Sequence, residues 1–190
     1  MKITAGKWRG RKLEVPEGTD VRPTSDMVRQ AIFNILQGYG HPQDSFVLDV
    51  FCGTGALGLE ALSRGAAHCF FMDIDKKSLS YAARNIASAK AGEHCISVHG
   101  DALNPGPFAD EIPATLLFLD PPYRKGLINH ALTALAGRGW LEPQALCVAE
   151  CEKELAAQAP PGFTLLDDRS YGGTRILFLR YTGDKPAAQR

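Results

Sequence analysis

A chain of 190 residues is long enough for one domain with its own hydrophobic core and needs neither disulfides nor a metal to fold. Hydrophobic residues make up 45% of it and charged residues 22%, ordinary values that exclude a disordered or fibrous protein. Lysine plus arginine and aspartate plus glutamate number 21 each, so the net charge alone does not indicate a polyanionic partner.

The first forty residues are predicted to form a basic extension. Apolar residues on either side of Gly6 and Gly10 predict a hairpin, which Pro16 and Gly18 end. The basic residues of this region are Lys2, Lys7, Arg9, Arg11, Lys12, Arg22 and Arg29. Taken alone, a solvated charged face explains them better than a nucleic-acid site, because acidic residues follow soon after and weaken the field.

A helix is expected to follow the hairpin. Thr24 or Ser25 is a suitable N-cap, and Asp26 suits the first turn of a helix. Apolar residues then recur at helical spacing from Val28 until Gly38. The helix therefore has one apolar face that must pack against the rest of the chain.

From Ser45 onward, short apolar runs of strand length alternate with helical stretches. The predicted strands are 46–50, 68–72, 95–99, 115–119, 145–149, 163–166 and 175–181, and the predicted helices are 57–64, 78–89 and 127–136. Such alternation predicts an α/β fold with a mostly parallel seven-stranded sheet and helices on both faces. Gly172 and Gly173 lie between the last two strands and predict a hairpin, which makes one C-terminal strand antiparallel.

The cysteines and histidines do not indicate a metal site. The five cysteines contain no C-x-x-C pair and mostly lie in apolar runs, where a thiol packs like a small hydrophobic group. No ligand-spaced cluster of cysteines and histidines occurs, so no metal is expected. The sequence also lacks a signal peptide and a membrane-spanning apolar run, which leads us to expect a cytoplasmic protein.

A glycine-rich turn follows the first predicted strand of the sheet. In the run from Asp49 to Gly58, Gly53 and Gly55 allow a tight turn close to a ligand, and Gly58 allows the following helix to lie against a strand. Open α/β sheets bind ligands at this edge. The motif alone fits a dinucleotide site or a turn needed only for packing, and it leaves the ligand open.

Two further acidic residues narrow the choice of ligand. Asp73 ends the second strand, twenty positions after Gly53, where a carboxylate can accept hydrogen bonds from both ribose hydroxyls, although Asp75 is equally available. Asp101 follows the third strand and can accept from an adenine amino group, while the Ala102 amide addresses the ring. Three consecutive strand ends with suitable groups favour an adenosine-containing ligand.

The tetrapeptide from Asp120 to Tyr123 is the most specific feature of the chain. Pro121 and Pro122 restrict the backbone and donate no hydrogen bonds, so the carboxylate and the Pro121 carbonyl can act as rigid acceptors. An exocyclic base amine needs such acceptors to point its lone pair at a methyl donor. Tyr123 offers an aromatic face for a base that has left its stack.

These motifs resemble the class I methyltransferases with a D/N-P-P-Y motif, and in particular the bacterial RsmD-like enzymes that methylate guanine N2 in small-subunit ribosomal RNA. The N-terminal block discriminates best, because its G-K-W-R-G-R hairpin with R-P-T resembles this family alone. The resemblance also covers the glycine loop, Asp120 to Tyr123 and the closing Tyr171-Gly172. It implies a Rossmann-like methyltransferase domain over 41–190, with an RNA-contacting extension over 1–40.

The resemblance further implies the roles of individual residues. S-adenosylmethionine is the implied cofactor, and its implied contacts are Asp49, Gly53, Thr54, Gly55, Asp73, Ile74, Asp101 and Ala102. The implied catalytic residues are Asp120, Pro121, Pro122 and Tyr123, and the implied RNA contacts are Lys7, Arg9, Arg11, Lys12, Arg22 and Arg29. The implied partner is 16S rRNA in the small subunit or an assembly intermediate, with ribosomal protein contacts and a monomeric enzyme.

Other functions stay open at this point. The same tetrapeptide fits adenine-N6 methylation of DNA or RNA, and the basic hairpin fits an assembly factor that binds RNA without turnover. A nicotinamide dehydrogenase would explain the glycine loop but would leave Asp120 to Tyr123 without a role.

Overall fold

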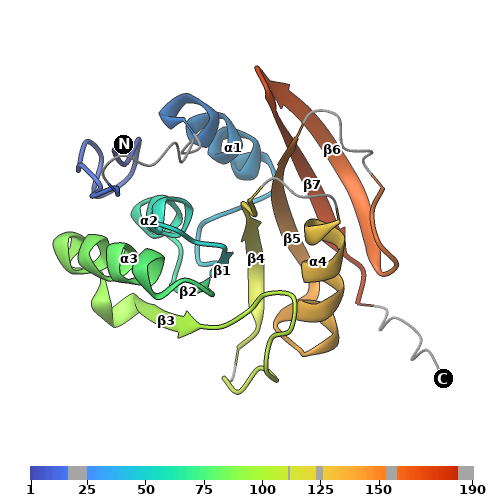
Figure 1. Ribbon diagram of the computed structural model, residues 1–190. Coiled ribbons are helices and arrows are strands. Elements are labelled where there is room, and N and C mark those ends of the chain that lie inside the picture. The colour runs from blue at the N-terminus through green and yellow to red at the C-terminus, as the bar shows by residue number, and fades with distance from the viewer. Residues whose placement is uncertain (17–24, 111, 123–125, 153–157, 184–190) are drawn as a thin grey trace.

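The fold is built on one twisted sheet, seen here in a computed structural model that describes residues 1–16, 25–110, 112–122, 126–152 and 158–183. Its seven strands lie in the order β3-β2-β1-β4-β5-β7-β6 (Figure 1). The strands are β1 Phe46–Val50, β2 His68–Asp73, β3 Cys95–His99, β4 Ala114–Leu119, β5 Leu141–Glu152, β6 Phe163–Tyr171 and β7 Thr174–Tyr181. The helices are α1 Asp26–Gly38, α2 Ala56–Ser63, α3 Lys76–Ala89 and α4 Leu127–Gly137, with a short 3₁₀ helix at Gly92–His94.

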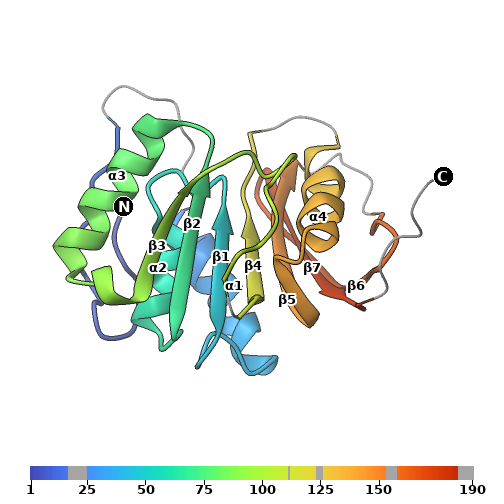
Figure 2. The same ribbon diagram turned by 90° about the horizontal axis from the view of Figure 1, so that it is seen from below.

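The pairing of the strands confirms the predicted sheet. β3, β2, β1, β4 and β5 pair in parallel, and β7 runs antiparallel to both of its neighbours, β5 and β6. The arrows of β1, β2 and β4 point to the same edge of the sheet in Figure 2. The segments that follow these strands therefore meet at one edge, where the predicted site residues lie.

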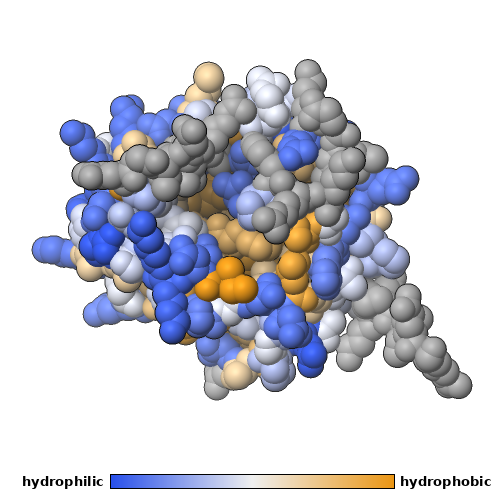
Figure 3. All heavy atoms as spheres, viewed as in Figure 1, coloured by the Kyte–Doolittle hydropathy of each residue, from blue (hydrophilic) through white to orange (hydrophobic). Residues whose placement is uncertain are grey.

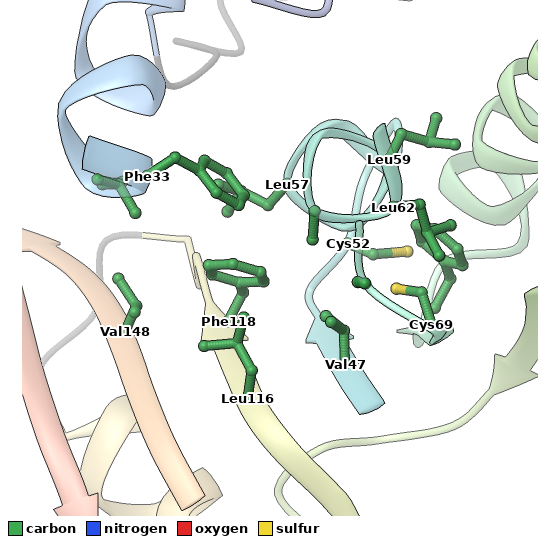
Figure 4. Close-up of a cluster of buried hydrophobic side chains, with 14 of the residues drawn as sticks. Phe33, Val47, Cys52, Leu57, Leu59, Leu62, Cys69, Leu116, Phe118 and Val148 are labelled. Atoms are coloured by element: carbon green, nitrogen blue, oxygen red, sulfur yellow. The ribbon is translucent and has the colours of Figure 1, made fainter. Parts of the chain in front are cut away.

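Helices cover both faces of the sheet, as predicted. One core cluster joins α1, α2 and α3 to one face, and a second cluster joins α4 to the other face. Figure 4 shows part of the first cluster, in which Phe33 of α1 and Leu57 of α2 lie over Phe118 of β4. Cys52 and Cys69 also pack in this cluster, and all five cysteines are free thiols, as the sequence led us to expect.

Most predicted elements begin and end within a few residues of their observed bounds. The hydroxyl of Ser25 accepts a hydrogen bond from the Val28 amide at 3.2 Å, so Ser25 is the N-cap of α1. Strand β5 begins four residues before its predicted start, because the exposed residues 142–144 separate the buried Leu141 from the apolar run that predicts the strand. No helix in the described ranges is long and apolar enough to cross a membrane.

The N-terminal hairpin forms as predicted. An isolated β-bridge joins Lys2 to Lys12, and the Ile3 amide donates to the Arg11 carbonyl at 2.9 Å. Ile3 and Leu13 are buried in the same core as α1, α2 and the sheet. The division of the chain at residue 40 stays a prediction, and the hydrophobic residues on its two sides share one core.

The carboxylate of Glu60 in α2 anchors the hairpin. Glu60 is fully buried and accepts hydrogen bonds from the Thr4 amide (2.8 Å), the Thr4 hydroxyl (2.7 Å) and the Ala5 amide (3.0 Å). It also forms ion pairs with Arg29 at 3.3 Å and Arg64 at 2.8 Å. Five donors converge on one carboxylate, so its charge is compensated without water.

The tip of the hairpin docks on the last turn of α2. The Lys7 amide donates to the Ser63 carbonyl at 2.8 Å, and the Trp8 amide donates to the Ser63 hydroxyl at 3.0 Å. Gly6 has a positive φ of 80° and lies against the Ser63 carbonyl, so a side chain there would collide with the helix. The basic hairpin therefore has a defined position relative to the sheet.

Replacing Glu60 with Gln is expected to lower the free energy of unfolding by about 3 kcal/mol, because the neutral side chain leaves two arginines without their buried counter-charge. The measurement is the urea midpoint at constant m value. Glu14→Gln is the matched control, since the Glu14–Arg84 pair is half exposed and its loss should cost less than about 1 kcal/mol. Equal losses in the two variants would contradict the anchoring role of Glu60.

Candidate functional site

The glycine loop between β1 and α2 has the backbone that its residues predict. Gly53 and Gly55 have φ values of 54° and 77°, a region that favours glycine. At Gly58, an added Cβ would overlap the ring of Phe71 and lie 2.6 Å from the Cys69 sulfur, so the absence of a side chain lets α2 lie against β2. The expected packing role of Gly58 is confirmed.

Asp49 lies beneath this loop, near the end of β1. Its side chain is buried and accepts a hydrogen bond from the Gly58 amide at 2.9 Å. Burial raises the pKa of Asp49 well above its usual value, the Gly58 hydrogen bond opposes this, and the charges of Asp120 and Asp73 raise it further. Asp73 and Asp120, from the two strands that flank β1, therefore lie close enough to Asp49 to disfavour its charged form, and a cationic ligand would relieve this repulsion.

Asp73 connects the end of β2 to the glycine loop. One of its oxygens accepts from the Gly53 amide at 3.0 Å, and the other accepts from the Asp75 amide at 2.9 Å. Asp75 instead caps α3, with its carboxylate accepting from the Lys77 and Ser78 amides. Of the two acids that the sequence left open for the ribose, Asp73 thus lies at the loop, and its oxygens retain lone pairs for hydroxyl donors.

Ile74, Asp101 and Ala102 lie beside Asp73 at the same edge of the sheet. Ile74 is 61% exposed, which is unusual for a large aliphatic side chain and offers an apolar contact to a ring. The Gly100 amide donates to the Asp73 carbonyl at 3.1 Å, which holds the end of β3 beside the end of β2. Asp101 accepts from the Leu103 amide at 2.9 Å, and Ala102 is buried next to it.

An aromatic cluster holds the loop that carries Asp101. The Trp140 indole donates to the Gly106 carbonyl at 2.8 Å, and the rings of Phe70, Phe108 and Trp140 contact one another with centroids 5.0–6.3 Å apart. These residues were not predicted to serve the site. Their signal in the sequence is weak, because isolated aromatic residues are common in strands and loops and only the fold brings these three together.

The segment from Asp120 follows β4 at the same edge. Asp120 is half-buried, Pro121 is buried and Pro122 is exposed, while Tyr123 lies outside the described residues. Figure 3 looks onto this edge of the sheet and shows a hollow with hydrophobic residues on its floor and hydrophilic residues around it. Such a hollow suits a ligand with an aromatic ring and a few polar groups.

The predicted RNA contacts separate into two groups. Arg29 is fully buried, where it pairs with Glu60 and Asp26 and donates to the Lys2 carbonyl. It cannot reach a phosphate from the interior, so the prediction that Arg29 contacts RNA is wrong, and Arg29 instead supports the hairpin. The exposed residues of the set are Lys7, Arg9, Arg11 and Lys12, and Arg22 lies outside the described residues.

The four exposed basic residues differ in how firmly they are held. Lys7 lies over the ring of Trp8, with its ammonium 4.5 Å from the ring centroid, and the Arg11 guanidinium donates to the Ser88 carbonyl in α3. Arg9 and Lys12 have no side-chain partner within the described ranges. They are therefore available to contact phosphates.

Comparison with known proteins identifies the family. A family model described as "Conserved hypothetical protein 95" matches residues 1–180. The chain is 40% identical over 156 residues to the Escherichia coli protein named "Ribosomal RNA small subunit methyltransferase D", covering 81% of this chain and 76% of that protein. The chain belongs to this RsmD-like methyltransferase family.

Further comparisons agree with this family assignment. The Haemophilus influenzae protein of the same name is 35% identical over 178 residues, which cover 90% of this chain and 89% of that protein. The solved structure of the Escherichia coli protein yhhF superposes with a TM-score of 0.82 at 35% identity, over 97% of this chain and 99% of that one. The fold is therefore the Rossmann-like fold of class I methyltransferases.

S-adenosylmethionine is the cofactor of this family and fold. A magnesium protoporphyrin IX methyltransferase from Synechocystis, solved with bound S-adenosylmethionine, shares the fold at a TM-score of 0.62 and 16% identity. The edge of the sheet suits this cofactor, because its sulfonium and ammonium charges would meet the carboxylates around Asp49, and Ile74 offers an apolar contact to adenine.

Replacing Asp73 with Asn is expected to weaken S-adenosylmethionine binding by about tenfold or more, because a neutral amide is a weaker acceptor for ribose hydroxyls. The measurement is calorimetric titration. Asp75→Asn is the matched control, since asparagine caps a helix as well as aspartate does and α3 should stay intact. Equal affinities for S-adenosylmethionine in the two variants would contradict the assignment of Asp73 to the cofactor site.

Proposed function

We propose that the protein transfers a methyl group from S-adenosylmethionine to the exocyclic N2 amine of a guanine in 16S rRNA. The observation that carries this proposal is the position of Asp120 beside Asp49, with Pro121 next in the chain, at the edge of the sheet where the cofactor loop lies. The names of the relatives as small-subunit rRNA methyltransferases support the substrate class. The docked basic hairpin supports an RNA substrate.

The chemistry needs an amine whose lone pair is directed at the methyl carbon. The lone pair of guanine N2 is conjugated into the ring, so the amine is a poor nucleophile until acceptors hold its hydrogen atoms. The Asp120 carboxylate and the Pro121 carbonyl supply two such acceptors, and Tyr123 supplies a face on which the flipped base stacks. The cofactor supplies the methyl group on its sulfonium sulfur.

The proton balance gives Asp120 a second role. As the N–C bond forms and the C–S bond breaks, the amine becomes positively charged and must lose one proton to give the neutral product. The charge of Asp120 stabilises this developing cation, and the proton then passes to solvent. This role explains why an acceptor with a negative charge lies beside Asp49 despite the repulsion between the two carboxylates.

The substrate is proposed to be the small subunit or an assembly intermediate, bound by a monomeric enzyme. The net charge of the chain is zero, which disfavours strong attraction to free RNA. Lys7, Arg9, Arg11 and Lys12 lie within six residues of one another on the hairpin and are exposed, so RNA contacts are proposed there and ribosomal protein surfaces are proposed to complete recognition.

The direct test is methyl transfer from labelled S-adenosylmethionine to small subunits prepared from cells that lack this gene, followed by nucleoside analysis. Labelled N2-methylguanosine is the expected product. Labelled N6-methyladenosine would support the alternative adenine reaction. Binding of subunits without any transfer would support a non-catalytic assembly factor.

Asp120→Ala is expected to lower kcat by about 100-fold or more, since one acceptor and its charge are lost. Asp120→Asn should be less impaired, because the D/N-P-P-Y motif allows asparagine at this position. Single-turnover transfer to small subunits is the measurement. Asp110→Ala removes an exposed carboxylate before the start of β4, at the opposite end of that strand from Asp120, and should behave as wild type. A near-normal rate for Asp120→Ala would rule out this mechanism.

Replacing Arg9 and Lys12 together with Gln is expected to weaken RNA binding and flatten its salt dependence by a slope of about 0.7 per lost contact. Affinity for small subunits would be measured over a range of salt concentrations. The control is Arg138→Gln with Arg169→Gln, which removes the same charge from residues of the α4 end and β6. An unchanged slope in the hairpin variant would refute its role in phosphate contact.

A further inference from the structure

Asn85 connects three separate segments of the chain through one side chain. It lies in α3, is 2% exposed, and occupies the helix face that also buries Ala82, Ile86 and Ala89. Its Oδ1 atom accepts from the Glu14 amide at 2.7 Å. Its Nδ2 atom donates to the Glu14 carbonyl and to the Thr54 carbonyl, each at 3.0 Å.

The two ends of this connection belong to different parts of the site. Thr54 lies between Gly53 and Gly55 in the cofactor loop, whereas Glu14 lies two residues after Lys12, the last basic residue of the hairpin. The amide of Asn85 therefore pairs with the backbone of Glu14 as a neighbouring strand would, and uses its second hydrogen atom for the loop.

Burial makes this connection a constraint. A buried amide that loses a partner cannot replace it with bulk water, so each broken bond carries the cost of an unsatisfied polar group. The backbone of Asn85 is held by α3, whose apolar face packs in the core. A displacement of the Thr54 carbonyl therefore strains or breaks its hydrogen bond to Asn85 and shifts the amide that also holds Glu14.

Two further contacts, closer to the protein surface, join the N-terminal segment to the cofactor loop and to α3. The Thr54 hydroxyl lies 3.8 Å from the Met1 sulfur in a weak hydrogen bond, and the Arg84 guanidinium pairs with the Glu14 carboxylate at 2.9 Å. Arg84 also lies over the ring of Tyr81 in α3. These contacts are exposed or weak, so Asn85 is the main link.

We propose that Asn85 is a positioning residue that couples occupancy of the cofactor loop to the N-terminal RNA-contacting segment. The coupling rests on the proposed function, because it assigns Thr54 to the cofactor site and the hairpin to RNA. Linkage then requires reciprocity: cofactor tightens RNA binding by the same factor by which RNA tightens cofactor binding. An enzyme of this kind engages its substrate best when the methyl donor is already bound.

The test uses Asn85→Asp, which keeps the shape of the side chain but replaces its donor with a second acceptor facing two carbonyls. Amide hydrogen exchange is measured on the full chain with and without S-adenosylhomocysteine. Affinity for small subunits is measured under the same two conditions. Asn129→Asp is the matched control, because Asn129 is exposed on α4 and its amide donates only to the Gln158 carbonyl among the described residues.

In wild type, S-adenosylhomocysteine should slow exchange at the Glu14 amide and raise subunit affinity by about fivefold or more. Both effects should persist in Asn129→Asp and disappear in Asn85→Asp. If Asn85→Asp does not fold, Asn85→Ser removes the same bridge with a smaller polar group, and the same losses are expected.

The coupling would be overturned if S-adenosylhomocysteine did not slow exchange at the Glu14 amide in wild type, or if the Asn85 variants kept the full effect. It would also be overturned if the Asn85 variants bound subunits more weakly but kept the wild-type ratio of affinities with and without S-adenosylhomocysteine. That last result would indicate a purely structural role for Asn85. Failure of the proposed function can be distinguished from failure of the coupling. In that case small subunits give no N2-methylguanosine, while the exchange at Glu14 still responds to S-adenosylhomocysteine.

Discussion

The buried carboxylate of Glu60 is the interaction on which the arrangement of the site depends. It lies in α2, the helix that begins at the glycine loop, and it holds the N-terminal hairpin through Thr4 and Ala5. The same helix donates its Gly58 amide to Asp49. One short helix therefore carries the cofactor loop at its start and the basic hairpin at its end, so the two have a fixed separation.

A charge buried in this way is stable only because its compensation is complete. Arg29 and Arg64 supply the opposite charge, and two backbone amides with one hydroxyl supply the remaining donors. Such a cluster adds less to stability than a hydrophobic core of the same volume, but it strongly opposes any other placement of its members. The cluster thus sets the position of the hairpin, which hydrophobic contacts alone define less sharply.

The carboxyl edge of the sheet brings several aspartate side chains close together. Asp73 and Asp120 both repel the charged form of Asp49, and backbone hydrogen bonds from Gly58 to Asp49 and from Gly53 to Asp73 offset part of the cost of placing these carboxylates together. The negative charge at this edge suits a cationic cofactor and, in the proposed reaction, a developing positive charge on the amine. The raised pKa of Asp49 and the proposed chemistry of the site therefore have one electrostatic origin.

The sequence by itself determined the elements, the sheet and the strand ends that carry Asp49, Asp73, Asp101 and Asp120, because strand and helix periodicity and glycine conformation are local properties. Only the tertiary structure decided that Arg29 supports the hairpin instead of facing solvent, and that Asp75 caps α3 while Asp73 meets the loop. It alone also showed the roles of Glu60 and Asn85, whose partners lie up to 71 residues away. The reason is physical: the charge or polarity of a residue is visible in the sequence, whereas its partner depends on which segments the fold brings together.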